Sequence, residues 1–373
     1  MKSPLRPLGI TQGVAFAALT GPEELARRAG LPGLVRLGSN ESPFGPSPRT
    51  LDAMRAAAGE ANRYGDPSNA LLRGALAAHH GVAPEHIAVA AGIDDLLGLA
   101  VRAFLTPGGP AMAALGSFPT FEMHARGYGA HLTLVPYLPE ARLDLAGLTA
   151  AVEAAGGGLV FLPNPDNPSG TAYPWEAVVQ FAQGLPAGAL VIHDEAYANF
   201  LPRAERFPSD AIDPRILRMR TFSKEYGLAG LRVGYALGSL EAIAALDAVR
   251  LLYGVNRIAQ AAALAALGDA DYMESVVERT AQGRADYVDL GKRLGIRTVP
   301  SQTNFVLFDV GDAARADRVV RGLRERGIHV RKPPSPPLDG TVRVSVGTQT
   351  ERALLAGALE RILCGEGPRR GER

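Results

Sequence analysis

Residues 221–232 of the chain read TFSKEYGLAGLR, and this stretch carries the strongest signal for the fold. Lys224 follows a hydroxyl residue, Ser223, and a glycine-rich turn separates the pair from Arg232. A lone lysine is most often a solvated surface charge. Here serine and arginine are natural ligands of a phosphate, and glycine lets the backbone approach a ligand closely. The stretch therefore predicts a functional lysine beside an anion site, and such a lysine can form a Schiff base with an aldehyde cofactor.

Short apolar runs alternate with helical stretches around this segment. Polar residues follow several of the runs directly, among them Asn164, Asp194 and Ser223. Alternation of this kind predicts an α/β fold, with a mostly parallel sheet covered by helices on both faces and ligands at the carboxyl ends of the strands. We expect strands at 159–162, 190–192, 216–219 and 233–237, and helices at 94–104 and 175–184.

The texture changes after about residue 256, where Ala-rich and charged helical patterns replace the strand–helix alternation. Consecutive prolines make 332–337 a loop, because proline breaks both helices and strand ladders. We expect a large domain at 45–256, a small C-terminal α+β domain at 257–373, and an N-terminal segment at 1–44 that joins the small domain. The small domain should hold helices at 258–267, 272–294 and 316–326, and strands at 304–308 and 341–346.

Composition narrows the class of protein. The chain has 373 residues and a net charge of +1, which gives no electrostatic footprint for nucleic acid or an anionic membrane. Its one cysteine, Cys364, excludes a disulfide framework, and the seven histidines show no metal-ligand spacing. Lys2 and Arg6 precede a mildly apolar run at 13–19, which is too short and too polar at its borders for a signal peptide. We expect a cytoplasmic protein without a metal site.

Three motifs in register resemble the cofactor site of fold-type-I enzymes that use pyridoxal 5'-phosphate (PLP), in the class I and II aminotransferase group. They are NPDNPSG at 164–170, DEAY at 194–197 and the SK pair at 223–224, and each closes an expected strand. The resemblance implies PLP as cofactor. It also implies that Lys224 carries the cofactor and moves the substrate proton, while Ser223 and Arg232 hold the phosphate.

The same resemblance assigns the remaining PLP contacts. Asp194 pairs with the pyridine nitrogen, although aspartate is also a common helix cap. Tyr197 and Asn167 bind the ring's phenolic oxygen; the alternatives are a core tyrosine and an Asx turn. The turn AGIDD at 91–95 opens a helix whose N-terminus suits a phosphate, and it supplies Gly92, Ile93 and Asp94. Phe121 matches the aromatic ring that lies on the cofactor, with plain core packing as the alternative.

Residues 37–48, LGSNESPFGPSP, resemble a segment of histidinol-phosphate aminotransferases, and the likeness extends from about residue 37 to 363. It implies a homodimer in which Tyr64 reaches the neighbour's PLP phosphate. Arg343 matches the arginine that grips an α-carboxylate. Arg331 matches one that helps to bind the substrate phosphate, or is a strand-end surface charge. Asn40 and His124 are further candidates for substrate contact, although His124 fits a polar helix residue equally well.

One departure concerns the substrate. The family's N-terminal tyrosine is absent, because no tyrosine precedes Tyr64. The resemblance as a whole implies amino transfer between histidinol phosphate and 2-oxoglutarate, that is, between a small-molecule amino donor and a 2-oxo acid acceptor. Aminotransfer from aromatic or other amino acids on the same scaffold is the first alternative, and the missing tyrosine favours it. A decarboxylase of the threonine-phosphate type is less favoured by residues 37–48, and a PLP sensor fused to a DNA-binding module ranks last.

Overall fold

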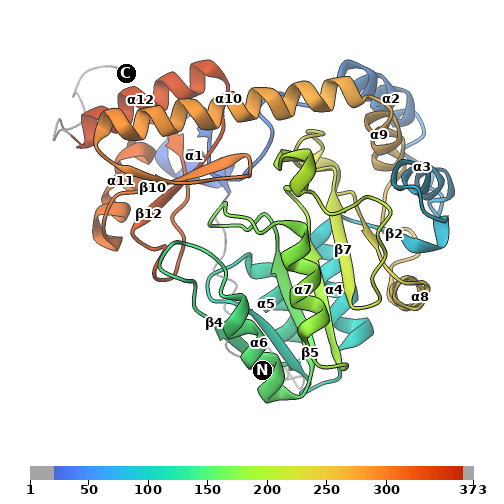
Figure 1. Cartoon of the computed structure of the whole chain (residues 1–373). Coiled ribbons are helices and arrows are strands. Elements are labelled where there is room, and N and C mark those ends of the chain that lie inside the picture. Colours follow the sequence, from blue (N-terminus) through green and yellow to red (C-terminus); the bar gives the residue numbers. More distant parts are fainter. Residues whose placement is uncertain (1–20, 364–373) are drawn as a thin grey trace, which may run out of the picture.

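The computed structural model describes residues 21–363, and Figure 1 shows their arrangement. The interpretations of Lys2, Arg6, 13–19 and Cys364 fall outside the described residues. A seven-stranded sheet forms the larger part of the molecule, in the order β2 (Ile87–Ala90), β8 (Gly234–Leu237), β7 (Ile216–Thr221), β6 (Ala189–Asp194), β5 (Gly158–Pro163), β3 (Pro110–Ala114) and β4 (His131–Val135). Strands β7, β6, β5, β3 and β4 run parallel, and β8 is antiparallel to both of its neighbours. The predicted α/β class with a mostly parallel sheet is confirmed.

Helices cover both faces of this sheet because its strands are apolar on both sides. Along β5, Phe161 packs against one set of helices while Val160 and Leu162 pack against the other, as the two-residue period of a strand requires. The first face carries α4 (Ile93–Phe104), α5 (Pro119–Gly127) and α8 (Leu240–Val249). The second face carries α6 (Leu145–Ala155) and α7 (Trp175–Gly184).

A second, smaller sheet holds β12 (Thr341–Ser345), β10 (Phe305–Asp309) and β9 (Arg297–Val299), paired antiparallel. Three helices pack with it around one apolar core: α10 (Ala270–Leu294), α11 (Ala313–Glu325) and α12 (Gln349–Leu363). Strand β1 (Val35–Arg36) pairs with β11 (Ile328–His329), and Leu37 is buried in the same core. This pairing supports the prediction that the N-terminal segment joins the small domain. Residues 21–363 also form α1 (Pro22–Ala29) and short 3₁₀ turns at Pro84–His86, Ala198–Phe200, Arg203–Glu205 and Ala229–Leu231.

Helix α9 (Arg257–Leu267) packs with the large sheet and not with the small one. Its buried alanines contact the core that also holds α3 (Ala70–His80), and α2 (Pro48–Ala58) lies against it. Figure 1 shows α10 running from beside α9 and α2 to the region of α11 and α12. The domain division stays a prediction, and this packing favours a boundary after residue 267 instead of 256.

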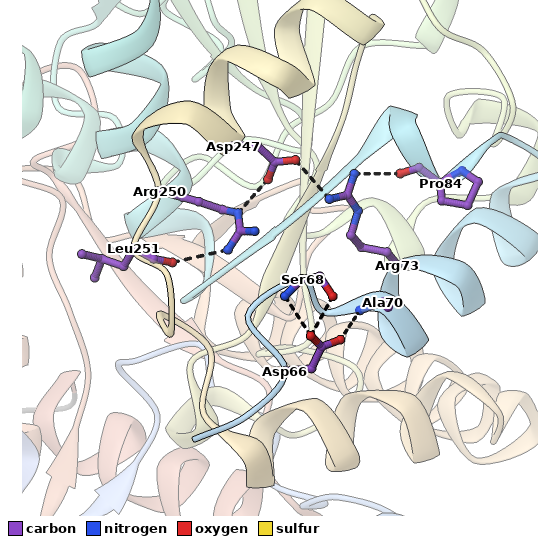
Figure 2. A network of polar contacts seen from close by, with 8 residues as sticks. All are labelled: Asp66, Ser68, Ala70, Arg73, Pro84, Asp247, Arg250 and Leu251. Carbon is purple, nitrogen blue, oxygen red and sulfur yellow. Dashed lines mark hydrogen bonds and ion pairs between the residues drawn. The ribbon is translucent and has the colours of Figure 1, made fainter. Parts of the chain in front are cut away.

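Figure 2 shows two groups of polar contacts near α3, one around Asp247 and one around Asp66. Arg73 on α3 pairs with Asp247 on α8 at 3.0 Å, and Arg250 pairs with the same carboxylate at 2.7 Å. Asp66 accepts hydrogen bonds from the backbone of Ser68 and of Ala70, at the start of α3. The Ser68 hydroxyl also donates to Asp66, and this hydrogen bond together with those from the backbone holds the pKa of Asp66 below its usual value. The pair of Arg73 and Asp247 thus joins α3 to α8, while Asp66 orders the start of α3.

Residues 21–363 include no helix that is both long enough and apolar enough to cross a bilayer.

Candidate active site

A cavity of about 650 Å³ lies where the carboxyl ends of the central strands meet the small sheet. The ends of β5, β6 and β7 supply Pro163, Asp194 and Thr221, while Arg343 comes from β12. The fold therefore brings segments from both ends of the chain to one site. Of the residues singled out in the sequence, the cavity wall holds Asn40, Ile93, Asp94, Asn167, Asp194, Tyr197, Ser223, Lys224, Arg232, Arg331 and Arg343.

One end of the cavity is built to hold an anion. Helix α4 begins at Ile93, and Gly92 caps it with φ of 86°, a conformation that favours glycine. The first N–H groups of a helix lack partners within the helix. Arg232 approaches from the facing loop and donates to Oδ2 of Asp94 at 3.1 Å, while Ser223 is buried beside it. Backbone N–H groups, a hydroxyl and a guanidinium thus converge, as a phosphate requires.

Asp194 ends strand β6 and is 5% exposed. Its Oδ1 accepts one hydrogen bond, from the backbone N–H of Ala196 at 2.9 Å. The next helical turn begins at Ala198 with Tyr197 as its N-cap, so Asp194 does not cap a helix. Burial raises the pKa of Asp194 to about 7. A cationic hydrogen-bond donor next to Asp194 would stabilise the ionised form of this buried carboxyl group.

Lys224 and Tyr197 lie close together in the cavity wall. The Nζ of Lys224 donates to the backbone oxygen of Asn40 at 3.2 Å and lies 5.5 Å from the centre of the Tyr197 ring. Tyr197 is buried, and its hydroxyl accepts a hydrogen bond from Nδ2 of Asn40 at 3.0 Å. Its ring packs edge to face on Phe305. Packing and hydrogen bonds therefore fix the tyrosine next to the lysine.

Arg343 sits on β12 and points into the cavity from the small sheet. Its Nη1 donates to Oδ1 of Asn167, and its Nη2 donates to the backbone oxygen of Gly38 at 2.8 Å. Within residues 21–363, its Nε is buried and has no hydrogen-bond partner. Burial lowers the pKa of Arg343 to about 10. A guanidinium left incompletely paired in this way is suited to a carboxylate ligand.

Arg331 lies next to Arg343, because the two residues form an isolated antiparallel bridge. Its N–H donates to the Arg343 carbonyl at 3.2 Å, and the Arg343 N–H donates back at 2.7 Å. Burial lowers the pKa of the Arg331 guanidinium. In the described part of the chain its side chain has no acidic partner within ion-pair distance. The cavity thus presents two neighbouring cations on one wall.

The structure corrects two predicted contacts, Phe121 and His124. Helix α5 starts at Pro119 and turns Glu122, Met123 and Arg126 toward the cavity. Phe121 consequently faces the opposite way, where its fully buried ring stacks on Phe161. His124, also on α5, packs against α4, with Nε2 donating to the backbone oxygen of Asp94 at 3.0 Å. Plain packing therefore describes Phe121, whereas Phe118, just before α5, lines the cavity wall.

Tyr64 and Gly92 lie outside the cavity wall of their own chain. Gly92 stands directly behind the wall, as the residue before Ile93. Tyr64 is 74% exposed and stacks on Tyr253, with ring centres 4.3 Å apart. Its predicted contact with a neighbouring subunit stays a prediction.

Several buried polar residues beside the site carry no strong sequence signal. Asp166 accepts from the Tyr137 hydroxyl at 3.0 Å and from the Ser169 backbone at 3.0 Å, which shapes the turn that presents Asn167. Burial raises the pKa of Asp166 to about 6. Ser345 contacts Asn40 from a strand 305 residues further along the chain. The variable position of the NPDNPSG motif could have suggested Asp166, whereas no local pattern indicates Ser345.

Comparisons with known proteins agree with this geometry. Residues 32–362 match the family "Aminotransferase class I and II". The chain is 38% identical to histidinol-phosphate aminotransferase 2 of Ralstonia nicotianae, over 91% of this chain and 92% of that protein. It is 35% identical to histidinol-phosphate aminotransferase of Moorella thermoacetica, over 91% and 88% of the two chains.

A solved structure shows the same likeness in three dimensions. It is histidinol-phosphate aminotransferase from Sinorhizobium meliloti in complex with pyridoxal-5'-phosphate, with a TM-score of 0.93 and 42% identity over 98% of this chain and 99% of that one. An aspartate aminotransferase variant from Thermus thermophilus follows at a TM-score of 0.76 and 26% identity, over 88% and 96% of the two chains. The chain therefore belongs to the class I and II aminotransferases, a family that uses pyridoxal phosphate.

Proposed function

We propose that this PLP-dependent aminotransferase exchanges an amino group between histidinol phosphate and 2-oxoglutarate. The observation that carries the proposal is the cavity wall itself, where an anion cradle, a buried carboxyl group, a lysine and two arginines converge. The choice of histidinol phosphate as substrate rests on the two histidinol-phosphate aminotransferases to which the chain is similar. Aminotransfer from aromatic amino acids is not favoured, because these relatives match over 91% of the chain.

The residues present fit PLP at each of its polar groups. A Cβ on Gly92 would stand 2.8 Å from Nη2 of Arg232, so a side chain at this position would displace the guanidinium from the helix end. Asp194, buried with a raised pKa, suits a protonated pyridine nitrogen. Asn167 and Tyr197 present an amide and a hydroxyl at the cavity wall. When bound there, PLP supplies the electron sink for reactions at an amino-bearing carbon.

The protein's own groups then perform positioning and proton transfer. Lys224 anchors the cofactor and, when its amine is free, accepts and returns a proton at Nζ. Asp194 keeps its partner nitrogen protonated, and Ser223 and Arg232 fix the phosphate end with the N–H groups of Ile93 and Asp94. Metal chemistry has no part in this proposal.

Arg343 and Arg331 suit the acidic groups of the two substrates, one a carboxylate and the other a phosphate. Glutamate and 2-oxoglutarate carry an α-carboxylate, for which Arg343 offers a planar fork of donors. Histidinol phosphate carries a phosphate in place of a carboxylate, and Arg331 supplies a neighbouring cation without an acidic partner in the part of the chain that the structure describes. One site can therefore bind both an amino acid and an amino-alcohol phosphate, one after the other.

Aminotransferases of this class generally act as dimers. We assign Tyr64 to the active site of the second subunit, because its ring is exposed and lies outside its own cavity wall. We also propose the cytoplasm as the compartment in which this enzyme acts.

A single-turnover screen tests the proposal. The PLP-loaded protein is mixed, without an acceptor, with histidinol phosphate, glutamate, phenylalanine or tyrosine, and the ketone formed per site is measured. We expect one equivalent per site from histidinol phosphate and from glutamate, and slow conversion of the aromatic amino acids. Faster conversion of phenylalanine than of histidinol phosphate would overturn the substrate assignment. A Lys224→Ala variant, with Lys292→Ala as a surface control, should form no ketone and retain no cofactor after borohydride treatment.

A further inference from the structure

Asn40 stands at the centre of a buried hydrogen-bond network that joins the small sheet to the reacting groups. The residue is 2% exposed and has φ of 53°, in the left-handed region that residues other than glycine rarely adopt. A backbone conformation of this kind costs free energy, so it persists only when neighbouring groups hold it in place. The groups that hold Asn40 are therefore informative about its task.

Ser345 is the first of these groups. The backbone N–H of Asn40 donates to Oγ of Ser345 at 2.9 Å, and that hydroxyl donates back to Oδ1 of Asn40 at 2.9 Å. Ser345 is fixed in turn, because its own N–H donates to Leu37 at 2.8 Å and its carbonyl accepts from the Tyr287 hydroxyl at 3.0 Å. A fully buried strand residue thus clamps Asn40 at two points.

Asn40 passes this constraint on to two residues of the large domain. Its Nδ2 donates to the Tyr197 hydroxyl at 3.0 Å, and its backbone oxygen accepts from Nζ of Lys224 at 3.2 Å. Asn304 donates to the same oxygen at 3.0 Å, so both lone pairs of that carbonyl are engaged. We infer that Asn40 is a positioning residue for Lys224 and Tyr197, and that Ser345 and Asn304 hold it from the small domain.

The inference changes the predicted part of Asn40. Both polar atoms of its side chain are engaged within the protein, Oδ1 with Ser345 and Nδ2 with Tyr197. Substrate contact, expected from the sequence, would have to break one of these bonds. A neutral amine has two N–H groups and one lone pair, so donating to a fixed carbonyl restricts where the lone pair of Lys224 points. This step rests on the proposed function, in which that lone pair accepts the substrate proton.

The reactivity of Lys224 can be measured directly, because the chain contains only four lysines: Lys2, Lys224, Lys292 and Lys332. Cofactor-free protein is treated with a limiting amount of an acetylating reagent, and the modification of each lysine is measured by mass spectrometry. Lys292, whose side chain is 72% exposed, serves as the internal reference. In Ser345→Ala we expect the relative reactivity of Lys224 to rise roughly fivefold, the change that corresponds to one lost hydrogen bond.

Thr280→Val is the matched control. It also removes a buried hydroxyl from the small domain, but that hydroxyl bonds only to the Val276 carbonyl of its own helix. Asn40→Gly is the second variant, because glycine adopts φ of 53° without strain and loses only the side chain. It should raise the reactivity of Lys224 as Ser345→Ala does. In the double variant Asn40→Gly/Ser345→Ala, the reactivity of Lys224 should change little beyond that of Asn40→Gly, because the two substitutions act through one contact.

The loaded enzyme gives an independent readout. Ser345→Ala should lower kcat about tenfold and leave the KM for the amino donor and the retention of PLP within about twofold. The kinetic isotope effect with an α-deuterated donor should increase, because proton transfer becomes slower. Unchanged Lys224 reactivity in folded Ser345→Ala and in Asn40→Gly would overturn the inference, as would an equal change in Thr280→Val. The lysine measurement needs neither cofactor nor substrate, so it decides the inference even if histidinol phosphate proves to be no substrate.

Discussion

The guanidinium of Arg232 lies so close to Gly92 that a Cβ at position 92 would stand 2.8 Å from its Nη2. The same nitrogen donates to Asp94 at 3.1 Å, which holds the guanidinium over the first turn of α4. The space that a phosphate needs at this helix end therefore depends on the absence of a side chain at Gly92.

Gly92→Ala should weaken PLP binding without unfolding the protein. The added methyl group pushes Arg232 away from the helix end, so one or two charge-assisted hydrogen bonds are lost and the Kd for PLP rises roughly tenfold to a hundredfold. Gly108→Ala is the control, because Gly108 has a similar φ of 80° but nothing within 4 Å of an added Cβ. Cofactor titration of both variants measures the effect. Equal loss of affinity in the two would mean that backbone strain alone is responsible.

Asp194 should make the stability of the cofactor-free protein depend on pH. Burial raises the pKa of this carboxyl from 3.8 to about 7 in the folded state. Between these values the unfolded chain has already released the proton that the folded protein keeps, so the contribution of Asp194 to stability is largest below pH 4 and falls as the pH rises to 7. Asp194→Asn removes this fall, which we expect to amount to roughly 1 to 4 kcal/mol. Urea unfolding of both proteins between pH 4.5 and 8 checks it, and parallel curves would contradict the assigned ionisation.

The motif residues could be predicted because their positions depend on local features. Asp194 is the last residue of β6 and Lys224 lies shortly after β7, and the carboxyl ends of these parallel strands meet at one edge of the sheet. The orientation of α5 could not be predicted, because it depends on how the helix packs against α4. Phe118 and Phe121 both contact the same apolar core. Phe118 also reaches the cavity wall, whereas Phe121 does not, and this difference depends on the orientation of the helix start.

The contact between Asn40 and Ser345 had no signal in the sequence either. The two residues are 305 positions apart, and each lies in a segment that reads as an ordinary loop or strand. The left-handed backbone of Asn40 is compatible with asparagine but is not specified by it. Long-range hydrogen bonds of this kind follow from the completed fold, so only the structure reveals them.

Tyr64 should act in the second subunit, and mixed dimers test this. Tyr64→Phe alone should weaken PLP binding about tenfold, since it removes one hydrogen bond to a phosphate. Tyr253→Phe is the control, because it keeps the ring that stacks on Tyr64. Mixing Tyr64→Phe with Lys224→Ala chains, under conditions that exchange subunits, should place both intact residues in about a quarter of the sites. The recovered turnover at low PLP should match that fraction. No recovery would mean that Tyr64 serves its own subunit or none.

Arg343→Lys should separate the two half-reactions. Lysine keeps the positive charge but loses the planar fork of donors, so the second-order rate constant for glutamate should fall roughly a hundredfold. Histidinol phosphate has no carboxylate, and its rate constant should fall less than about fivefold if Arg331 supplies the neighbouring charge. Arg331→Lys should show the opposite preference. Retention of PLP, measured by gel filtration, should stay within about twofold in both variants because neither arginine contacts the anion end of the cavity. Equal losses of glutamate turnover, histidinol-phosphate turnover and PLP retention in Arg343→Lys would show that Arg343 supports the fold of the site and does not read the substrate.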